Sequence, residues 1–73
     1  MHFVIMDVNV EEQALAATMS DGREITLPIA WFPRLMNATP KQRQNLEISP
    51  GGYGIHWPEI DEDISIKAFI DGL

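Results

Sequence analysis

A turn-forming tripeptide, Ser20-Asp21-Gly22, separates two segments in which apolar and polar residues alternate, and no other feature constrains the fold of this chain as strongly. Alternation with a period of two is typical of half-buried strands, so we predict an antiparallel hairpin from residues 13–19 and 23–27. The loop length decides which side chains share a face. A two-residue turn at Asp21-Gly22 places Met19 beside Glu24, which mixes apolar side chains with charge.

A three-residue loop removes this mismatch because it shifts the pairing register by one residue. Leu15 then lies opposite Leu27 and Ala17 opposite Ile25, so the apolar side chains share one face of the hairpin. We therefore predict a bulged hairpin with Gly22 in the left-handed region. Glycine adopts a positive φ without steric cost, so Gly22 implies no ligand.

A further strand is predicted before this hairpin, over residues 3–10. Met6 and Val8 fall on one face together with the other apolar residues at even positions, whereas Asp7 and Asn9 fall on the opposite face. The pair Glu11-Glu12 interrupts the alternation and turns the chain. The first half of the sequence is therefore predicted to be a β-meander of three strands.

The second half predicts two short helices. Pro33 suits the first turn of a helix because its missing donor is not needed there, so residues 34–37 are expected to form one or two helical turns. Thr39-Pro40-Lys41-Gln42 has the residues of a capping box, with Thr39 as the N-cap and Gln42 as its partner. A polar helix over residues 40–45 is expected to follow on the surface.

The remaining residues predict a second hairpin and a final helix. Residues 46–48 and 53–57 are strand-like and are joined by a glycine-rich turn, with Tyr53, Ile55 and Trp57 on one side. Residues 59–63 form an acidic connector, and residues 64–65 are extended. Ser65 is expected to cap a helix over residues 66–71, which Gly72 ends and which buries Ile66, Phe69 and Ile70.

These elements define the expected fold class. The chain has 73 residues, which allows a single domain over residues 1–73. We predict an α+β fold: a small antiparallel β-meander with two or three short helices, in which a single-layer sheet packs against the helices. A chain of this size buries only about 60% of its unfolded surface, so the core is thin and a homodimer or other homo-oligomer is an open alternative.

Composition excludes several functional classes. The sequence has 5 Lys and Arg against 11 Asp and Glu, and its formal charge of −6 opposes direct binding of nucleic acid or anionic lipid. The absence of cysteine excludes disulfides, thiolate zinc sites and thiol nucleophiles. No signal peptide or apolar run of about 18 residues is present, so we expect a cytoplasmic protein without a membrane span.

One polar cluster has residue types suited to chemistry, namely His56 followed by several carboxylates. A metal site is one reading, and a small hydrolytic enzyme with His56 and Asp61 or Asp63 as an acid–base pair is another. The spacing does not match a calcium loop. We instead expect a solvated segment whose carboxylates favour the start of the following helix and whose side chains point outward, or an acidic edge that binds a partner. No catalytic residue, cofactor or metal ligand is predicted.

Nucleophilic and phosphate-binding motifs are not found. Ser20, Ser49 and Ser65 each occupy a turn or cap position, and none lies in a Gly-x-Ser-x-Gly motif. The glycines at 51, 52 and 54 join two strands, whereas a phosphate cradle joins a strand to a helix.

A basic stretch near the middle of the chain offers a second candidate surface. It contains three of the five cations on predicted helices, next to an aromatic residue. The alternative for these residues is a solvated helix face and an aromatic residue in the core. Taken with the acidic edge, the candidate partner-binding residues are Trp31, Arg34, Lys41, Arg43, His56, Glu59, Asp61, Glu62 and Asp63.

Two sequence blocks resemble a known family. They are Ala30-Trp31-Phe32-Pro33-Arg34-Leu35 and the segment Trp57-Pro58-Glu59-Ile60-Asp61-Glu62-Asp63-Ile64, and weaker matches cover most of the remaining chain. The sequence resembles the bacterial domain of unknown function family 2442. The resemblance implies a small α+β unit without an established activity.

The resemblance also implies a class of function. Some members carry a helix-turn-helix domain, and others are encoded beside a second small protein in arrangements resembling toxin–antitoxin pairs. We therefore expect a protein-interaction module that is the antitoxin-like or accessory partner of another small bacterial protein encoded next to it. The alternative is a regulatory domain that acts on DNA only through a separate DNA-binding partner, and the small enzyme is less favoured.

Overall fold

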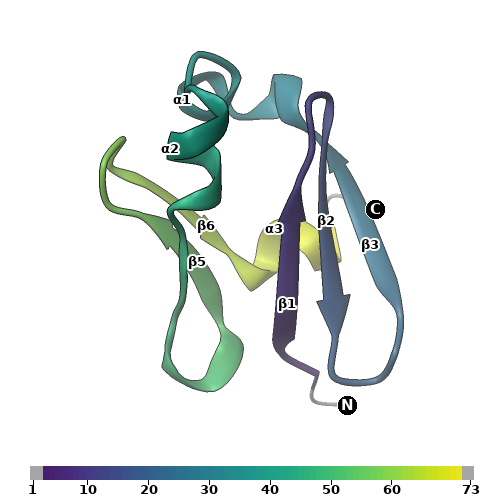
Figure 1. The fold of residues 1–73 in the computed structure, drawn as a ribbon. Coiled ribbons are helices and arrows are strands. Elements are labelled where there is room, and N and C mark those ends of the chain that lie inside the picture. Colours follow the sequence, from purple (N-terminus) through teal and green to yellow (C-terminus); the bar gives the residue numbers. More distant parts are fainter. Residues whose placement is uncertain (1–2, 72–73) are drawn as a thin grey trace.

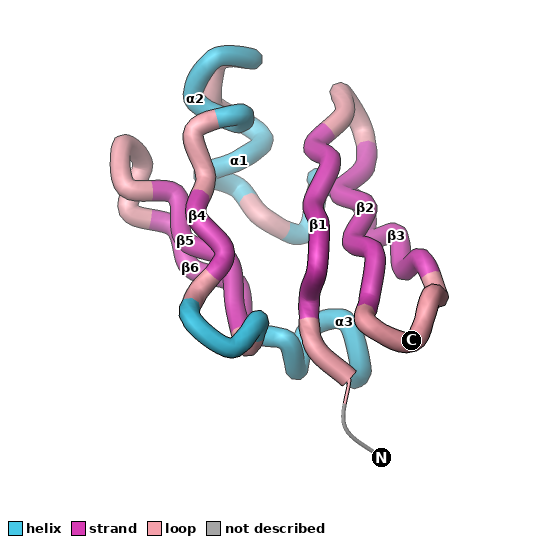
Figure 2. Tube along the Cα trace, turned by 60° about the horizontal axis from the view of Figure 1, so that its bottom comes forward, coloured by secondary structure: helices cyan, strands magenta, loops and turns pink. Residues whose placement is uncertain are grey.

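The computed structural model describes residues 3–71, and its strands form two antiparallel three-stranded sheets. The elements in chain order are β1 (Ile5–Val10), β2 (Ala14–Met19), β3 (Glu24–Pro28), the 3-10 helix η1 (Ile29–Trp31), α1 (Pro33–Met36), α2 (Pro40–Gln44), β4 (Glu47–Ile48), the 3-10 helix η2 (Pro50–Gly52), β5 (Gly54–Trp57), β6 (Glu62–Ser65) and α3 (Ile66–Asp71). One sheet has the order β1-β2-β3 and the other β4-β5-β6, and they lie side by side (Figures 1 and 2). The α+β class is confirmed, but two sheets replace the single one we expected.

The hairpin of β2 and β3 has the predicted register. Leu15 pairs with Leu27 and Ala17 with Ile25, and all four side chains are buried. Gly22 has a φ of 92°, and its N–H donates to the carbonyl of Met19 at 3.0 Å. The bulged three-residue loop is therefore confirmed.

The prediction for β1 is wrong at one position. The register against β2 shifts between Ile5 and Asp7, so Met6 is the extra residue of a β-bulge. Its side chain is 62% exposed, whereas Ile5 is only 2% exposed and takes the inward position. The bulge adds a residue to the strand and thereby changes which of the preceding side chains face inward.

The capping box before α2 is confirmed in both halves. The backbone N–H of Gln42 donates to Thr39 Oγ1 at 3.1 Å, and the backbone N–H of Thr39 donates to Gln42 Oε1 at 2.9 Å. Pro40 occupies the first turn, as expected. The cap fixes the start of α2 and hence the position of the side chains that the helix carries.

Replacing Thr39 with alanine is expected to lower the free energy of unfolding by about 1 kcal/mol, because the backbone N–H of Gln42 loses its acceptor, Thr39 Oγ1. Urea unfolding followed by circular dichroism measures the change. Thr39→Ser retains the hydroxyl and is expected to unfold close to the parent midpoint. Equal losses in the two variants would contradict the role of the cap.

The second sheet follows the predicted hairpin with two differences. Ile55 and Trp57 are buried, but Tyr53 is 62% exposed because it precedes β5 and its ring lies against Gly51. Strand β6 begins at Glu62 and pairs with β5, so part of the expected acidic connector is a strand. The first turn of α3 contains no acidic residue. The expected contribution of the acidic segment to the helix start is therefore wrong.

The C-terminal helix matches its predicted bounds, and Ser65 Oγ accepts a hydrogen bond from the N–H of Lys67 at 3.1 Å. Phe69 is fully buried and Ile66 is half-buried, as expected. Ile70 is 44% exposed, and Ala68 packs against the core. The predicted stop at Gly72 lies outside the described residues.

One hydrophobic cluster contains buried side chains from both sheets and from α1, η1 and α3. Its largest members are Trp57 and Phe69, which have no exposed surface. The indole N–H of Trp57 donates to the carbonyl of Arg43 at 2.9 Å, so the only polar group of this side chain is satisfied. Over residues 3–71, none of the helices has the length and apolar character that crossing a bilayer requires.

Candidate functional site

Arg43 was expected on an exposed basic face, but its guanidinium binds the backbone of its own chain. Nε donates to the carbonyl of Leu35 at 2.9 Å, and Nη2 donates to that of Met36 at 3.3 Å. Nη1 donates to the carbonyls of Glu11 and Glu12 at 3.1 and 3.0 Å. The side chain therefore joins the end of α1 to the β1–β2 turn, a structural role that residue type and spacing did not indicate.

Gln44 strengthens the same junction. Its side-chain N–H donates to the carbonyl of Val10 at 3.1 Å. Together with the Trp57–Arg43 hydrogen bond, this contact ties α2 to both sheets. The upper end of the molecule in Figure 1, where α1, α2 and the β1–β2 turn meet, is thus fixed by polar contacts from one short helix.

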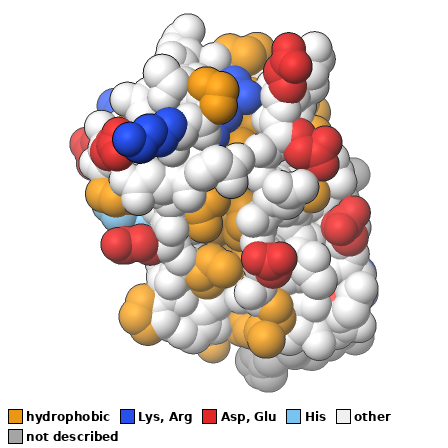
Figure 3. All heavy atoms as spheres, viewed as in Figure 1, with side chains coloured by type: hydrophobic (Ala, Val, Ile, Leu, Met, Phe, Trp, Pro, Cys, Tyr) orange, Lys and Arg blue, Asp and Glu red, His pale blue; other side chains and the backbone are white. Residues whose placement is uncertain are grey.

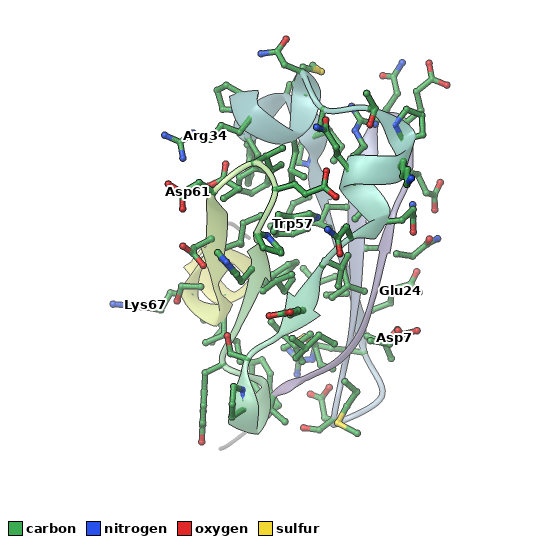
Figure 4. The ribbon with its side chains drawn as sticks, turned by 60° about the vertical axis from the view of Figure 1, so that its left-hand side comes forward. Asp7, Glu24, Arg34, Trp57, Asp61 and Lys67 are labelled. Atoms are coloured by element: carbon green, nitrogen blue, oxygen red, sulfur yellow. The ribbon has the colours of Figure 1, made fainter. Side chains whose placement is uncertain are left out.

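The other predicted cations remain exposed. Arg34 lies 3.8 Å from Asp61 Oδ2, and it also donates to the backbone carbonyl of Asp61. Figure 4 shows Arg34 and Asp61 on the same side of the molecule. The side chain of Lys41 is exposed on α2. The predicted basic face and acidic edge therefore meet at Arg34 and Asp61 and do not form two separate surfaces.

His56 lies between carboxylates on the exposed face of the second sheet. It pairs with Glu47 on β4 and Asp63 on β6, and its Nδ1 is 2.7 Å from Asp63 Oδ1. The two side chains thus lie within hydrogen-bond distance, which we did not expect, although both point outward, as expected. Their exposed fractions are 36% and 73%, so solvent reaches the pair.

The remaining acidic residues are also distributed over the surface. Glu59 accepts a hydrogen bond from Asn45 at 2.9 Å, and Glu62 accepts one from the N–H of Asp63 at 3.1 Å. Within residues 3–71, no group of three or more His, Asp or Glu side chains is placed to hold a metal ion. His56, Glu59 and Asp63 line none of the three surface hollows described below.

Trp31 is the predicted aromatic residue that the fold leaves accessible. Its side chain is 54% exposed and that of Met36 is 49% exposed, whereas neighbouring Leu35 is fully buried. Trp31 precedes the N-cap of α1 and Met36 is its fourth helical residue. These two positions commonly bring apolar side chains together across a helix start. Sequence reasoning found Trp31 but missed Met36.

Arg43 lines two hollows on the surface. One has a volume of about 390 Å³ and is lined by Glu12, Gln13, Pro28, Ile29, Ala30, Met36 and Arg43. The other has a volume of about 410 Å³ and is lined by Val10, Glu11, Glu12, Ala38, Pro40, Arg43 and Gln44. A third, of about 370 Å³, borders Arg34 and Ile60. These three hollows all border α1 or α2, whereas exposed apolar side chains also occur elsewhere, at Met6, Tyr53 and Ile70.

The family model described as "Protein of unknown function (DUF2442)" matches residues 5–73 of the sequence. The chain belongs to the DUF2442 family. The DUF2442 chain is also similar in fold to a crystal structure of a protein of unknown function from Rhodospirillum rubrum, with a TM-score of 0.84 and 21% identity. That similarity covers 100% of this chain and 90% of the other.

A second solved structure has the same fold. It is the solution NMR structure of an uncharacterised protein from Chromobacterium violaceum, with a TM-score of 0.77 and 25% identity. The match covers 94% of this DUF2442 chain but 65% of the other chain. Among curated proteins, no sequence matches.

Proposed function

We propose that this DUF2442 chain is a protein-interaction module, and that its partner is another small protein encoded next to it. The module acts as the antitoxin-like or accessory member of such a pair. The proposal rests on apolar side chains that the core does not bury. The buried residues form one hydrophobic cluster, while several large apolar side chains remain exposed to solvent.

The observation that supports it most directly is the exposure of Trp31 and Met36 around α1. Single exposed apolar residues are common on soluble proteins, but a half-exposed tryptophan and a half-exposed methionine within one short segment are not typical of a solvated surface. Tryptophan is among the residues that contribute most binding free energy at protein interfaces, and both residue types are enriched there. The segment η1–α1 is therefore the contact surface that we assign to the partner.

Co-expression of the full chain with the product of the adjacent gene tests the proposal. We expect the two proteins to co-purify, and we expect Trp31→Ala to weaken the complex at least tenfold in a titration by calorimetry. Tyr53→Ala is the matched control, because Tyr53 is 62% exposed and lies between η2 and β5, outside the η1–α1 segment.

The same experiment contains the contrary outcomes. Failure of the adjacent product to co-purify would count against the proposed pairing. Equal weakening by Trp31→Ala and Tyr53→Ala would show that η1–α1 is not the contact surface. Unfolding curves of both variants, measured first, establish that each remains folded.

A further inference from the structure

We infer that the hollow between the β1–β2 turn and α1 receives an apolar side chain of the partner that lies next to a lysine or arginine. This inference rests on the proposed function and names the chemistry of the partner. The hollow is the depression of about 390 Å³ lined in part by Pro28, Ile29 and Ala30, the residues that precede Trp31, and we call it the η1 hollow.

Four of the seven residues that line the η1 hollow are apolar. They are Pro28, Ile29, Ala30 and the half-exposed Met36. A methionine side chain adapts its shape to different apolar groups because it is unbranched and flexible. The hollow is therefore suited to an aliphatic or aromatic anchor, as in interfaces in which one side chain fills a small pocket.

The other three lining residues are the polar or charged Glu12, Gln13 and Arg43. Glu12 lines the η1 hollow, and neighbouring Glu11 lines the hollow on the other side of Arg43. No ion pair of either carboxylate is found within residues 3–71. Arg43 donates to the backbone carbonyls of Glu11 and Glu12, so one guanidinium and two carboxylates border this turn, and the sum of their formal charges is negative.

Arg43 also makes the hollow rigid and cannot readily turn toward a ligand. Its guanidinium already donates to four backbone carbonyls, which fixes the β1–β2 turn relative to α1. The walls are thus held in place before binding, which lowers the entropic cost of association. Figure 3 shows basic, acidic and apolar side chains close together at this upper end of the molecule.

These features select a partner segment with an apolar anchor beside a cation. The anchor fills the hollow, and the cation lies against the free Glu12 carboxylate. The net charge of −6 favours the encounter with such a basic segment over a distance. A purely acidic segment would be repelled by the same wall.

The test uses the full chain labelled with ¹⁵N and three synthetic peptides of equal length. One contains leucine and lysine, the second leucine and glutamate, and the third serine and lysine. We expect the leucine–lysine peptide to shift the amide resonances of Glu12, Gln13, Ala30 and Met36, and the other two peptides to leave them in place. Equal binding of the leucine–lysine and leucine–glutamate peptides, or shifts centred elsewhere, would overturn the inference.

Variants extend the test to the partner itself. Glu12→Gln is expected to weaken binding of the leucine–lysine peptide and of the co-purified partner severalfold, and Met36→Ala to weaken both about tenfold. Glu47→Gln removes the same charge from the other sheet and is the control, with binding close to that of the parent chain.

The outcomes separate this inference from the proposed function. If the adjacent product co-purifies but Glu12→Gln and Met36→Ala bind it with the affinity of the parent chain, the η1 hollow is not the binding site. The proposed function as a protein-interaction module then still stands. If no product co-purifies while the peptide still binds at the hollow, the proposed pairing fails and the assigned chemistry stands.

Discussion

Replacing Gly52 with alanine is expected to lower the free energy of unfolding by about 2–5 kcal/mol. Gly52 has a φ of 76°, and a Cβ at this position would lie 2.7 Å from the carbonyl oxygen of Ile5 and 2.8 Å from Val4 Cβ. The left-handed conformation costs an alanine about 1–2 kcal/mol, and overpacking against backbone adds about 1–3 kcal/mol. A domain of this size has a total stability of about 4–11 kcal/mol, so the variant is close to unfolding.

Gly22→Ala is the matched control for this experiment. Gly22 has a φ of 92°, and a Cβ there would have no atom within 4 Å. Its substitution is expected to cost only the conformational penalty of about 1–2 kcal/mol. Urea unfolding of both variants measures the difference. Equal losses would show that contact between η2 and the start of β1 does not stabilise the fold.

The second large effect is expected at Arg43. Arg43→Ala removes the donors to four backbone carbonyls at the β1–β2 turn and the end of α1. Solvent replaces some of these bonds because the site is only half-buried, so we expect a loss of about 2–4 kcal/mol in the free energy of unfolding. Hydrogen exchange is expected to accelerate first at amides near Glu12 and Met36.

Two further variants distinguish the geometry of Arg43 from its charge. Arg43→Lys keeps the charge but has a single ammonium group, which cannot contact all four carbonyls, so it is expected to recover less than half of the lost stability. Lys41→Ala removes an exposed cation from the same helix and is expected to change stability by less than about 0.5 kcal/mol. Full recovery by lysine would show that charge alone stabilises the junction.

The sequence predicted the elements whose information is local. The β2–β3 register followed from matching apolar faces across a short loop, and the capping box followed from Thr39 and Gln42 in adjacent turns. Each of these interactions is complete within a few residues. Burial of Ile55 and Trp57 followed from the same alternation.

Features that depend on distant contacts were not predicted. The bulge at Met6 changes the strand's alternation, and nothing in the neighbouring residues marks it. Gly52 was interpreted as a turn glycine, although its lack of a side chain also allows the backbone of Ile5 to approach. The separation of the strands into two sheets depends on contacts between segments distant in the sequence, which strand patterns alone do not specify.

The candidate site shows the same division. Trp31 was identified by residue type, and it is exposed. Arg43 was assigned to a surface by its charge, because its acceptors are backbone carbonyls and every residue carries one. Glu12 and Met36 were not singled out, since the hollow between them forms only when the β1–β2 turn and α1 meet.

The position of β3 at the edge of its sheet bears on how the chain behaves in concentrated solution. Arg23 and Ile29 direct their hydrogen-bonding groups toward β2, so by alternation those of Glu24, Thr26 and Pro28 point away from it. Proline has no N–H, and a carboxylate stands at the other end of this row. The outer edge of β3 therefore offers few backbone N–H donors to another extended chain, and the negative charge of Glu24 repels acidic chains. Both features oppose the addition of further strands and amyloid-like aggregation.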